Sequence, residues 1–308
     1  MKRVLASVQV VERVERHPDA DKLEVTSILG WKVVTRLGEV VPGQKVVFLE
    51  IDSVIHREMD WVPDHLKAKM GEDGTMTIRT MKIRKQLSQG LIVPLPNLGD
   101  IGECLTERLG VTKAPDGEPT DPGGKPFPVH LLDKTEQIRI QSEPGLIKRL
   151  LGRPYDITVK HDGTSATYLW DGDEFKVYSR NQEARRPSVY WDMAVKYDIA
   201  EKLRGTGLAI QGEICGPKIQ KNPLKLDEPM LYVFNVIDLK TRQRGPRVPG
   251  IPTVFHVESG DAFPYDTIEK LLSLSDGFYP GTKTPREGIV VTGEGGISFK
   301  VISNKYLL

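Results

Sequence analysis

The chain has 308 residues, and its 43 lysine and arginine residues against 42 aspartate and glutamate residues leave a formal net charge of +1 at pH 7. This length is enough for two domains, and the balanced charge excludes a protein that coats nucleic acid through bulk positive charge. The two isolated cysteines, Cys104 and Cys215, predict neither a disulfide framework nor a zinc ribbon and favour a reduced, cytoplasmic compartment. The sequence has no long apolar run and no signal peptide, so we expect no membrane contact.

Residues 1–110 contain short apolar and β-branched runs that are separated by turn residues. Val46 to Leu49 is a continuous apolar run typical of a buried strand, and the turn residues Val40 to Gly43 precede it. This pattern predicts a small closed β-barrel. Because the segment His17 to Val25 is similar to the opening of OB folds in tRNA-binding modules, we expect an OB-fold nucleic-acid-binding domain. The predicted strands cover residues 4–14, 23–29, 31–37, 45–51, 75–83 and 90–94.

Residues 111–128 are crowded with proline and glycine, which predicts a linker. A second domain is expected in residues 129–308, with helices at residues 190–204 and 267–273, where apolar residues recur three and four positions apart. The complete chain is therefore expected to have an α+β fold, with an OB-like barrel followed by antiparallel sheets flanked by helices. The predicted strands of the second domain cover residues 156–160, 165–170, 175–179, 208–213, 230–238, 288–292 and 296–301.

A lysine stands two residues before an aspartate–glycine turn in the segment Lys160-His161-Asp162-Gly163, between two predicted strands. Alone, this pattern also occurs in ordinary solvated hairpin turns. Five further segments follow it in order: Ser179-Arg180-Asn181, Gly212-Glu213, Phe234-Asn235-Val236-Ile237-Asp238, Glu287-Gly288-Ile289-Val290-Val291 and Phe299-Lys300-Val301-Ile302-Ser303. The ordered set resembles motifs I, Ia, III, IIIa, IV and V of the covalent nucleotidyltransferases, the superfamily of ATP-dependent ligases and RNA capping enzymes. The resemblance is strongest to RNA ligases with an N-terminal OB domain and a minimal C-terminal nucleotidyltransferase domain.

The resemblance implies that Lys160 is the nucleophile, which attacks the α-phosphorus of ATP and forms a lysyl-adenylate, and that Lys300 lies beside the α-phosphate. A free lysine has a pKa of about 10.4 and is protonated near neutral pH, so it is not nucleophilic. We therefore expect the site to lower the pKa of Lys160 through a bound metal and Lys300. The alternative interpretation of Lys160 is a turn lysine in water.

The resemblance also implies a metal site and a nucleotide site. Asp162, Glu213 and Glu287 are expected to hold the waters of a Mg²⁺ or Mn²⁺ ion, although each alone is also an ordinary surface acid. Phe234 is expected to stack on the adenine, with the alternative of a core phenylalanine. The residues expected to bind ATP are Thr158, Val159, Arg180, Asn181, Glu213, Phe234, Lys300 and Lys305.

The sequence also departs from the pattern of DNA ligases and capping enzymes. Those enzymes have an OB domain with a basic motif VI after motif V, whereas residue 308 lies eight residues after Lys300, and the OB-like region comes first. We therefore assign Arg139 to the leaving pyrophosphate, with a structural salt bridge as the alternative. Related RNA ligases often have a second lysine in motif V, where this chain has Ile302. Lys305 is the candidate substitute.

A basic stretch in the N-terminal part is expected to bind nucleic acid, although a solvated loop is the alternative. Its residues are Arg79, Lys82, Arg84 and Lys85. Together these features predict an ATP-dependent RNA ligase that joins a 3′-hydroxyl RNA end to a 5′-phosphate, at a nick in duplex RNA or an RNA–DNA hybrid. No obligate protein partner is expected. The alternatives are a DNA ligase, a capping-type guanylyltransferase, or a non-catalytic OB-fold protein that binds RNA or tRNA.

Overall fold

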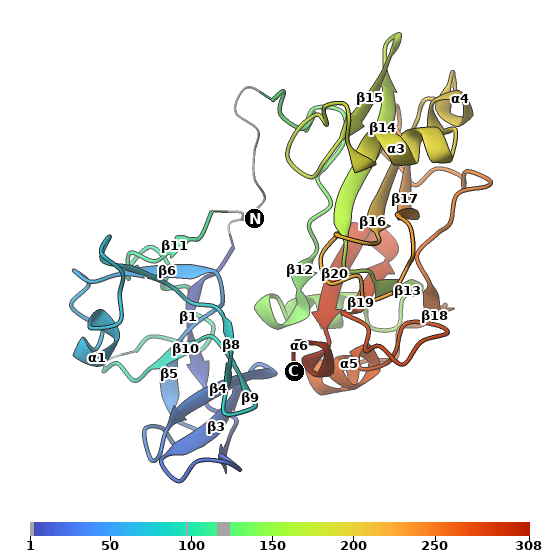
Figure 1. Cartoon of the computed structure of the whole chain (residues 1–308). Coiled ribbons are helices and arrows are strands. Elements are labelled where there is room, and N and C mark those ends of the chain that lie inside the picture. Colours follow the sequence, from blue (N-terminus) through green and yellow to red (C-terminus); the bar gives the residue numbers. More distant parts are fainter. Residues whose placement is uncertain (1–2, 97, 116–123) are drawn as a thin grey trace.

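The structure is a computed structural model that describes residues 3–96, 98–115 and 124–308. Two lobes lie side by side in Figure 1, an N-terminal lobe in blue and teal and a C-terminal lobe in green to red. Each lobe has hydrophobic clusters of its own, drawn from residues 5–111 in the first and from residues 127–301 in the second. Strands outnumber helices in both lobes, which confirms the predicted α+β class. No helix in the described part of the chain is long and apolar enough to cross a membrane.

The N-terminal lobe is built around β5, the strand predicted at Val46 to Leu49. Val47 and Leu49 pack into one hydrophobic cluster and Val46 and Phe48 into another, so both faces of the strand are buried. A strand buried on both faces needs a continuous apolar sequence, which is why this run stands out. The elements are β1 (Ala6–Val10), β2 (Arg13–Arg16), β3 (Leu23–Ile28), β4 (Trp31–Arg36), β5 (Lys45–Leu49), β6 (Ser53–His56), α1 (Asp64–Lys67), β7 (Thr75–Thr77), β8 (Thr80–Ile83), β9 (Gln86–Gln89), β10 (Leu91–Val93) and β11 (Thr112–Lys113).

The hydrogen-bonded ladders of this lobe are separate. Their orders are β1-β5-β10, β2-β3-β4, β11-β6-β7 and β8-β9, and within the described residues they do not join into one closed ladder. The predicted strand at residues 75–83 is divided into β7 and β8, which pair with different neighbours. Side-chain packing between the sheets, rather than a continuous ladder, therefore closes the lobe around its core.

The C-terminal lobe consists of two antiparallel sheets and short helices. One sheet has the order β12-β20-β19-β13-β18, with β12 alone parallel to its neighbour, and the other has the order β15-β14-β16-β17. The elements are β12 (Ile138–Arg139), η1 (Ile140–Ser142), α2 (Gly145–Leu150), β13 (Tyr155–Lys160), β14 (Thr164–Asp171), β15 (Glu174–Tyr178), α3 (Val189–Lys196), α4 (Ile199–Leu203), β16 (Leu208–Cys215), β17 (Met230–Asp238), β18 (His256–Gly260), α5 (Ile268–Ser275), β19 (Gly288–Gly293), η2 (Glu294–Gly296), β20 (Ile297–Ile302) and α6 (Asn304–Leu307).

The connection between β13 and β14 matters for function because it joins the two sheets. β13 belongs to the first sheet and β14 to the second, and only residues 161–163 separate them. The predicted turn after Lys160 therefore lies where the two sheets meet.

The helix predicted at residues 190–204 is interrupted. The structure has α3 and α4 in its place, with Asp198 between them in the left-handed conformation at φ 51° and ψ 43°. Asp is one of the few non-glycine residues that tolerate this conformation, and periodicity alone does not reveal such a break. The second predicted helix corresponds to α5, which is capped by the Thr267 side chain.

The two lobes touch through buried and polar side chains. Gly30, in the turn between β3 and β4, lies against α5, because a Cβ there would be 2.5 Å from Ile268 Cγ2. Ser142 Oγ donates a hydrogen bond of 2.6 Å to Glu50 Oε2. Figure 1 shows α5 and α6 on the side of the C-terminal lobe that faces the N-terminal lobe.

Both ends of the predicted linker, residues 111–128, belong to a lobe. Val111 is buried in the N-terminal core, and Phe127 is buried in a C-terminal cluster. Residues 116–123 of that prediction lie outside the described residues. We propose that the N-terminal domain extends past residue 110 to β11.

Candidate active site

A cavity of about 990 Å³ opens between the two sheets of the C-terminal lobe. This volume is of the size that small-molecule sites commonly have. Most of the residues predicted to bind ATP or metal line it: Thr158, Val159, Lys160, Asp162, Arg180, Glu213, Phe234 and Lys300. The structure thus brings together side chains from segments more than 100 residues apart in the sequence.

Lys160 is placed by the pairing of β13 with β19. It is the last residue of β13 and lies opposite Gly288, so Glu287 lies beside it. Lys160 Nζ is 2.8 Å from Glu287 Oε2. The Tyr279 hydroxyl donates to the carbonyl of Lys160 and accepts from the backbone N–H of Glu287, both at 3.3 Å. The backbone that carries the lysine is therefore fixed relative to the backbone that carries the carboxylate.

The turn after Lys160 is held by close packing. A Cβ on Gly163 would lie 2.3 Å from the carbonyl oxygen of Ile214, so only glycine lets the turn approach β16 this closely. The His161 ring is buried, with its centroid 4.7 Å from that of Tyr232 and 5.0 Å from that of Phe255. Burial lowers the pKa of His161 to about 4, so the imidazole is neutral at physiological pH. His161 therefore anchors the turn as an aromatic core residue.

The surroundings of Lys160 act on its pKa in opposite directions. Burial lowers it, but Glu287, Glu213 and Asp162 all raise it, and the net result is a raised pKa. Among the protein's own groups the carboxylates thus outweigh burial. The lowering of this pKa by a bound metal stays a prediction. Lys160 is therefore held as an ammonium. It becomes nucleophilic only when the carboxylates stabilise this positive charge less strongly.

The three carboxylates also crowd one another. Burial raises the pKa of Glu213 to about 7, and the neighbouring charges of Glu287 and Asp162 add to the rise. No group of three or more histidine, cysteine, aspartate or glutamate side chains among the described residues is arranged to hold a metal ion directly. Magnesium commonly keeps several of its waters, so Asp162, Glu213 and Glu287 fit a divalent cation held through water. Their role in metal binding stays a prediction.

Lys300 differs from Lys160 in its electrostatics. It lies on β20, with Arg139 opposite it on β12 and Val290 opposite it on β19. Burial, reinforced by the positive charges of Lys160 and Arg139, lowers the pKa of Lys300 to about 8. Near neutral pH Lys300 is thus protonated, but neighbouring carboxylates offset little of its positive charge, as expected of a group that binds a phosphate.

Arg139 does not line the cavity. Its guanidinium lies at the contact between the lobes, with its carbon 5.4 Å from the centre of the Trp31 ring, and its Nη1 is buried with no hydrogen-bond partner among the described residues. Burial lowers the pKa of Arg139, while Asp52, Glu287 and Glu50 oppose the change. The assignment to pyrophosphate stays a prediction, and the observed surroundings also fit a role in joining the lobes.

The lowered pKa of Lys300 predicts a pH dependence. If charged Lys300 binds the α-phosphate, kcat/KM for ATP falls as pH rises through about 8, because the free enzyme then loses that charge. In Lys300→Arg this falling limb disappears, since guanidinium stays protonated. The measurement is the pH profile of covalent labelling by ATP. Lys305→Arg is the control and retains the limb; a limb that persists unchanged in Lys300→Arg contradicts the assignment.

The other predicted nucleotide-binding residues differ in position. Arg180 lines the cavity and its Nη2 is 3.0 Å from Glu136 Oε1. Asn181 does not line it; Lys134 Nζ donates to Asn181 Oδ1 at 3.0 Å. The Lys305 side chain is 72% exposed, with its Nζ 3.5 Å from Asp276 Oδ2, and it too lies outside the cavity lining.

Phe234 is only partly buried, and its side chain lies where the main cavity meets a smaller one of about 240 Å³. This exposure fits a ring that stacks on a base better than a core phenylalanine. We expect Phe234→Ala to raise KM for ATP on the order of tenfold, because stacking on one base contributes about 1–3 kcal/mol. Phe234→Trp keeps most of the affinity. The control is Phe278→Ala, which removes an exposed ring outside the cavity; equal KM values in both alanine variants contradict the stacking role.

Some residues at the site were missed by the sequence interpretation. Residues 132–137 line the cavity, including Glu136, and so does Gln220, between β16 and β17. Tyr306, on α6, donates a hydrogen bond to Asp162 Oδ2. None of these segments has a motif or periodicity that indicates its position. Arg242 and Arg244, which belong to a stretch rich in lysine and arginine at residues 240–247, also line the cavity.

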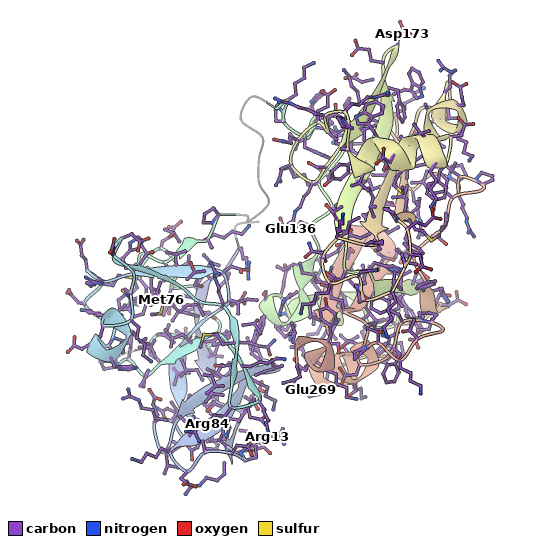
Figure 2. The ribbon with its side chains drawn as sticks, viewed as in Figure 1. Arg13, Met76, Arg84, Glu136, Asp173 and Glu269 are labelled. Carbon is purple, nitrogen blue, oxygen red and sulfur yellow. The ribbon has the colours of Figure 1, made fainter. Side chains whose placement is uncertain are left out.

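The predicted nucleic-acid-binding residues of the N-terminal lobe lie apart from the cavity. Arg79, Lys82, Arg84 and Lys85 are all exposed, and the last two form the turn between β8 and β9. Figure 2 labels Arg84 in the lower part of the N-terminal lobe and Glu136 on the other lobe. None of the four residues lines the nucleotide cavity.

Comparison with known proteins agrees with the geometry. A family model described as RNA ligase matches residues 153–306, which include Lys160, Asp162, Glu213, Glu287 and Lys300, and a model described as an OB-fold domain matches residues 5–95. The chain belongs to the RNA ligase family. It is a ligase with an N-terminal OB fold, as the sequence predicts. No match was found among the curated proteins.

Solved structures of an RNA ligase from Naegleria gruberi are similar to nearly the entire chain. An apo mutant is 30% identical, covers 99% of this chain and 98% of its own, and superposes with a TM-score of 0.80. A mutant with AMP and Mn gives the same values. The enzyme with pyrophosphate is 31% identical, with a TM-score of 0.78 and the same coverage.

Proposed function

We propose that this protein uses ATP to join a 3′-hydroxyl RNA end to a 5′-phosphate. The observation that carries the proposal is the position of Lys160, which lies at the cavity beside Glu287, Glu213 and Asp162, within the residues matched by the RNA ligase model. Structures of the Naegleria ligase have been solved with ATP, AMP, pyrophosphate and Mn, which supports the same nucleotide and metal for this chain.

The proposed reaction has three steps. Lys160 Nζ attacks the α-phosphorus of ATP, the bond to the pyrophosphate breaks, and AMP remains on the lysine. The 5′-phosphate of the RNA then attacks the adenylate and takes over the AMP, which frees Lys160. In the last step the 3′-hydroxyl attacks the activated 5′-phosphate, the new phosphodiester forms, and AMP leaves.

The residues of the cavity have separate tasks in this scheme. Phe234 holds the adenine, main-chain groups at Thr158 and Val159 lie at its edge, and Glu213 is near enough to Lys160 to meet the ribose as well as a metal-bound water. Lys300 neutralises the α-phosphate, because phosphoryl transfer depends mainly on positioning and charge stabilisation. A bound Mg²⁺ or Mn²⁺ supplies further positive charge to the phosphates. Arg139, Arg180, Asn181 and Lys305 are proposed as further phosphate and sugar contacts.

The two domains are proposed to divide the work. Residues 129–308 contain the cavity and catalyse all three steps, whereas residues 1–110 contribute RNA affinity through Arg79, Lys82, Arg84 and Lys85. The proposed substrate is a nicked duplex of RNA, or RNA paired with DNA. We further propose that the enzyme works in the cytoplasm without an obligate protein partner.

A sealing assay tests the proposal. The purified protein is incubated with a nicked duplex that carries a 3′-hydroxyl RNA end and a 5′-phosphate, and product is followed with ATP or GTP and with Mg²⁺ or Mn²⁺. We expect sealing that needs ATP and metal and exceeds the joining of unpaired RNA ends. Preference for GTP indicates a capping-type enzyme, and equal sealing of a 3′-hydroxyl DNA end indicates a DNA ligase. Nucleic-acid binding without any covalent chemistry indicates a non-catalytic protein.

A further inference from the structure

The connection between β16 and β17 carries lysines that do not line the nucleotide cavity. We call residues 216–229 the lysine loop, after the exposed residues Lys218, Lys221 and Lys225. None of the three lysines lines the cavity. Nearby lysines that form ion pairs are Lys160, Lys196 and Lys305. Within the described residues, no ion pair joins a carboxylate to any of the three loop lysines.

The backbone of the lysine loop is held in a defined conformation. Lys218, Gln220, Asn222 and Lys225 all have left-handed backbone angles, with φ of 64°, 47°, 44° and 52°. Non-glycine residues adopt this conformation at a cost, so the rest of the structure must enforce it. The Asn222 side chain does so in part, since it donates to the Leu226 carbonyl at 2.9 Å and accepts from the Leu226 N–H at 3.1 Å.

The loop is also fixed to the catalytic residues. Leu224 is buried in the cluster that contains Val159 and Tyr279, which flank Lys160. Gln220 Nε2 donates to the Gly163 carbonyl at 3.4 Å. Lys221 Nζ is 5.9 Å from the centre of the Tyr306 ring, whose hydroxyl donates to Asp162. The loop is therefore fixed beside the turn that follows Lys160, where Gln220 lines the cavity and Lys221 lies near Tyr306.

We propose that the lysine loop binds the phosphate backbone of the RNA next to the break. The inference rests on the proposed function, because it names where the substrate of that site is held. A polynucleotide end must enter the cavity to reach Lys160, and its backbone then passes the mouth. Uncompensated lysines on a fixed backbone suit phosphates, which lysine binds as a point charge without reading sequence.

The test is binding of an unreactive nicked duplex that has a 5′-hydroxyl at the nick, measured by fluorescence anisotropy in 50–200 mM salt. The variant is the triple substitution Lys218→Ala, Lys221→Ala and Lys225→Ala in the complete chain. The matched control replaces three exposed lysines elsewhere, Lys69, Lys148 and Lys283, by alanine and removes the same charge. We expect the affinity of the loop variant to fall about tenfold or more. Its slope of log Kd against log salt should decrease by about 0.9 for each phosphate that the loop no longer neutralises.

Two further readouts separate the outcomes. In the loop variant, labelling by ATP stays within about twofold of wild type, because the lysines lie outside the cavity. In a second variant, Lys→Arg substitutions at the three positions retain RNA affinity. The inference is overturned if the loop variant binds RNA with wild-type affinity, or if the control loses as much affinity as the loop variant. In either case the proposed function stands as long as the wild-type protein still labels and seals. A parallel loss of labelling, RNA binding and melting temperature shows a structural loop and also overturns it. Absence of labelling in the wild type refutes the proposed function itself.

Discussion

Lys160→Ala abolishes covalent labelling of the protein by ATP, with an expected loss of at least about 10⁴-fold, since the change removes the amine that is proposed to attack ATP. Lys160→Arg is equally inactive, because a guanidinium is not deprotonated near neutral pH. The rate of labelling with radioactive ATP and metal measures the effect. Lys160→Met, which keeps an unbranched side chain only one atom shorter, distinguishes loss of the amine from loss of packing.

The control for these variants is Lys148→Ala, which removes an exposed lysine from α2 and leaves labelling unchanged. The melting temperature of each variant shows whether the fold persists. Lys160 is 23% exposed and lies at the cavity, so its replacement empties little core volume. A folded Lys160 variant that still acquires AMP contradicts the proposed mechanism.

Glu287→Gln lowers the rate of labelling by about 10²- to 10³-fold, in the range found when one charge-stabilising group is removed. The sign of the effect is informative. Glu287 is the neighbouring charge that most raises the pKa of Lys160, so if that were its only role, its neutralisation would free the amine and speed labelling. A loss means that the carboxylate is needed for the reaction, as expected for a group that holds a metal-bound water.

The measurement is the labelling rate as a function of Mg²⁺ or Mn²⁺ concentration. We expect Glu287→Gln, Glu213→Ala and Asp162→Ala to need more metal and to reach lower maximal rates, since groups that act as one unit give large and non-additive losses. Glu294→Gln, an exposed carboxylate just after β19, serves as the control. Wild-type metal dependence in any two of the three site variants contradicts the metal assignment.

Much of the fold follows from local sequence pattern. The range predicted for β17, residues 230–238, matches the structure, and the apolar run at Val46 to Leu49 forms the central strand of the N-terminal lobe. Short elements such as α2 and α6 were missed because four to six residues contain too little periodicity to be recognised. The break at Asp198 depends on a single backbone conformation that has no counterpart in hydrophobic spacing.

The candidate site was predictable to the extent that it lies in motifs. Lys160, Glu213 and Lys300 come together because β13, β16 and β20 converge at the junction of two sheets, and Glu287, just before β19, lies beside Lys160. The raised pKa of Lys160 could not be predicted from motif order, since it depends on distances between carboxylates that only the folded chain sets. The proximity of Arg139 to Trp31 was likewise invisible, because it joins two lobes across more than 100 residues of sequence.

Intact-mass spectrometry of the protein after incubation with ATP and Mg²⁺ tests the central claim most directly. The account predicts a mass increase of one AMP, carried on the peptide that contains Lys160, and reversed by added pyrophosphate. Lys160→Met shows no increase under the same conditions. An unmodified wild-type mass at saturating ATP and metal, or AMP carried on another residue, contradicts the account.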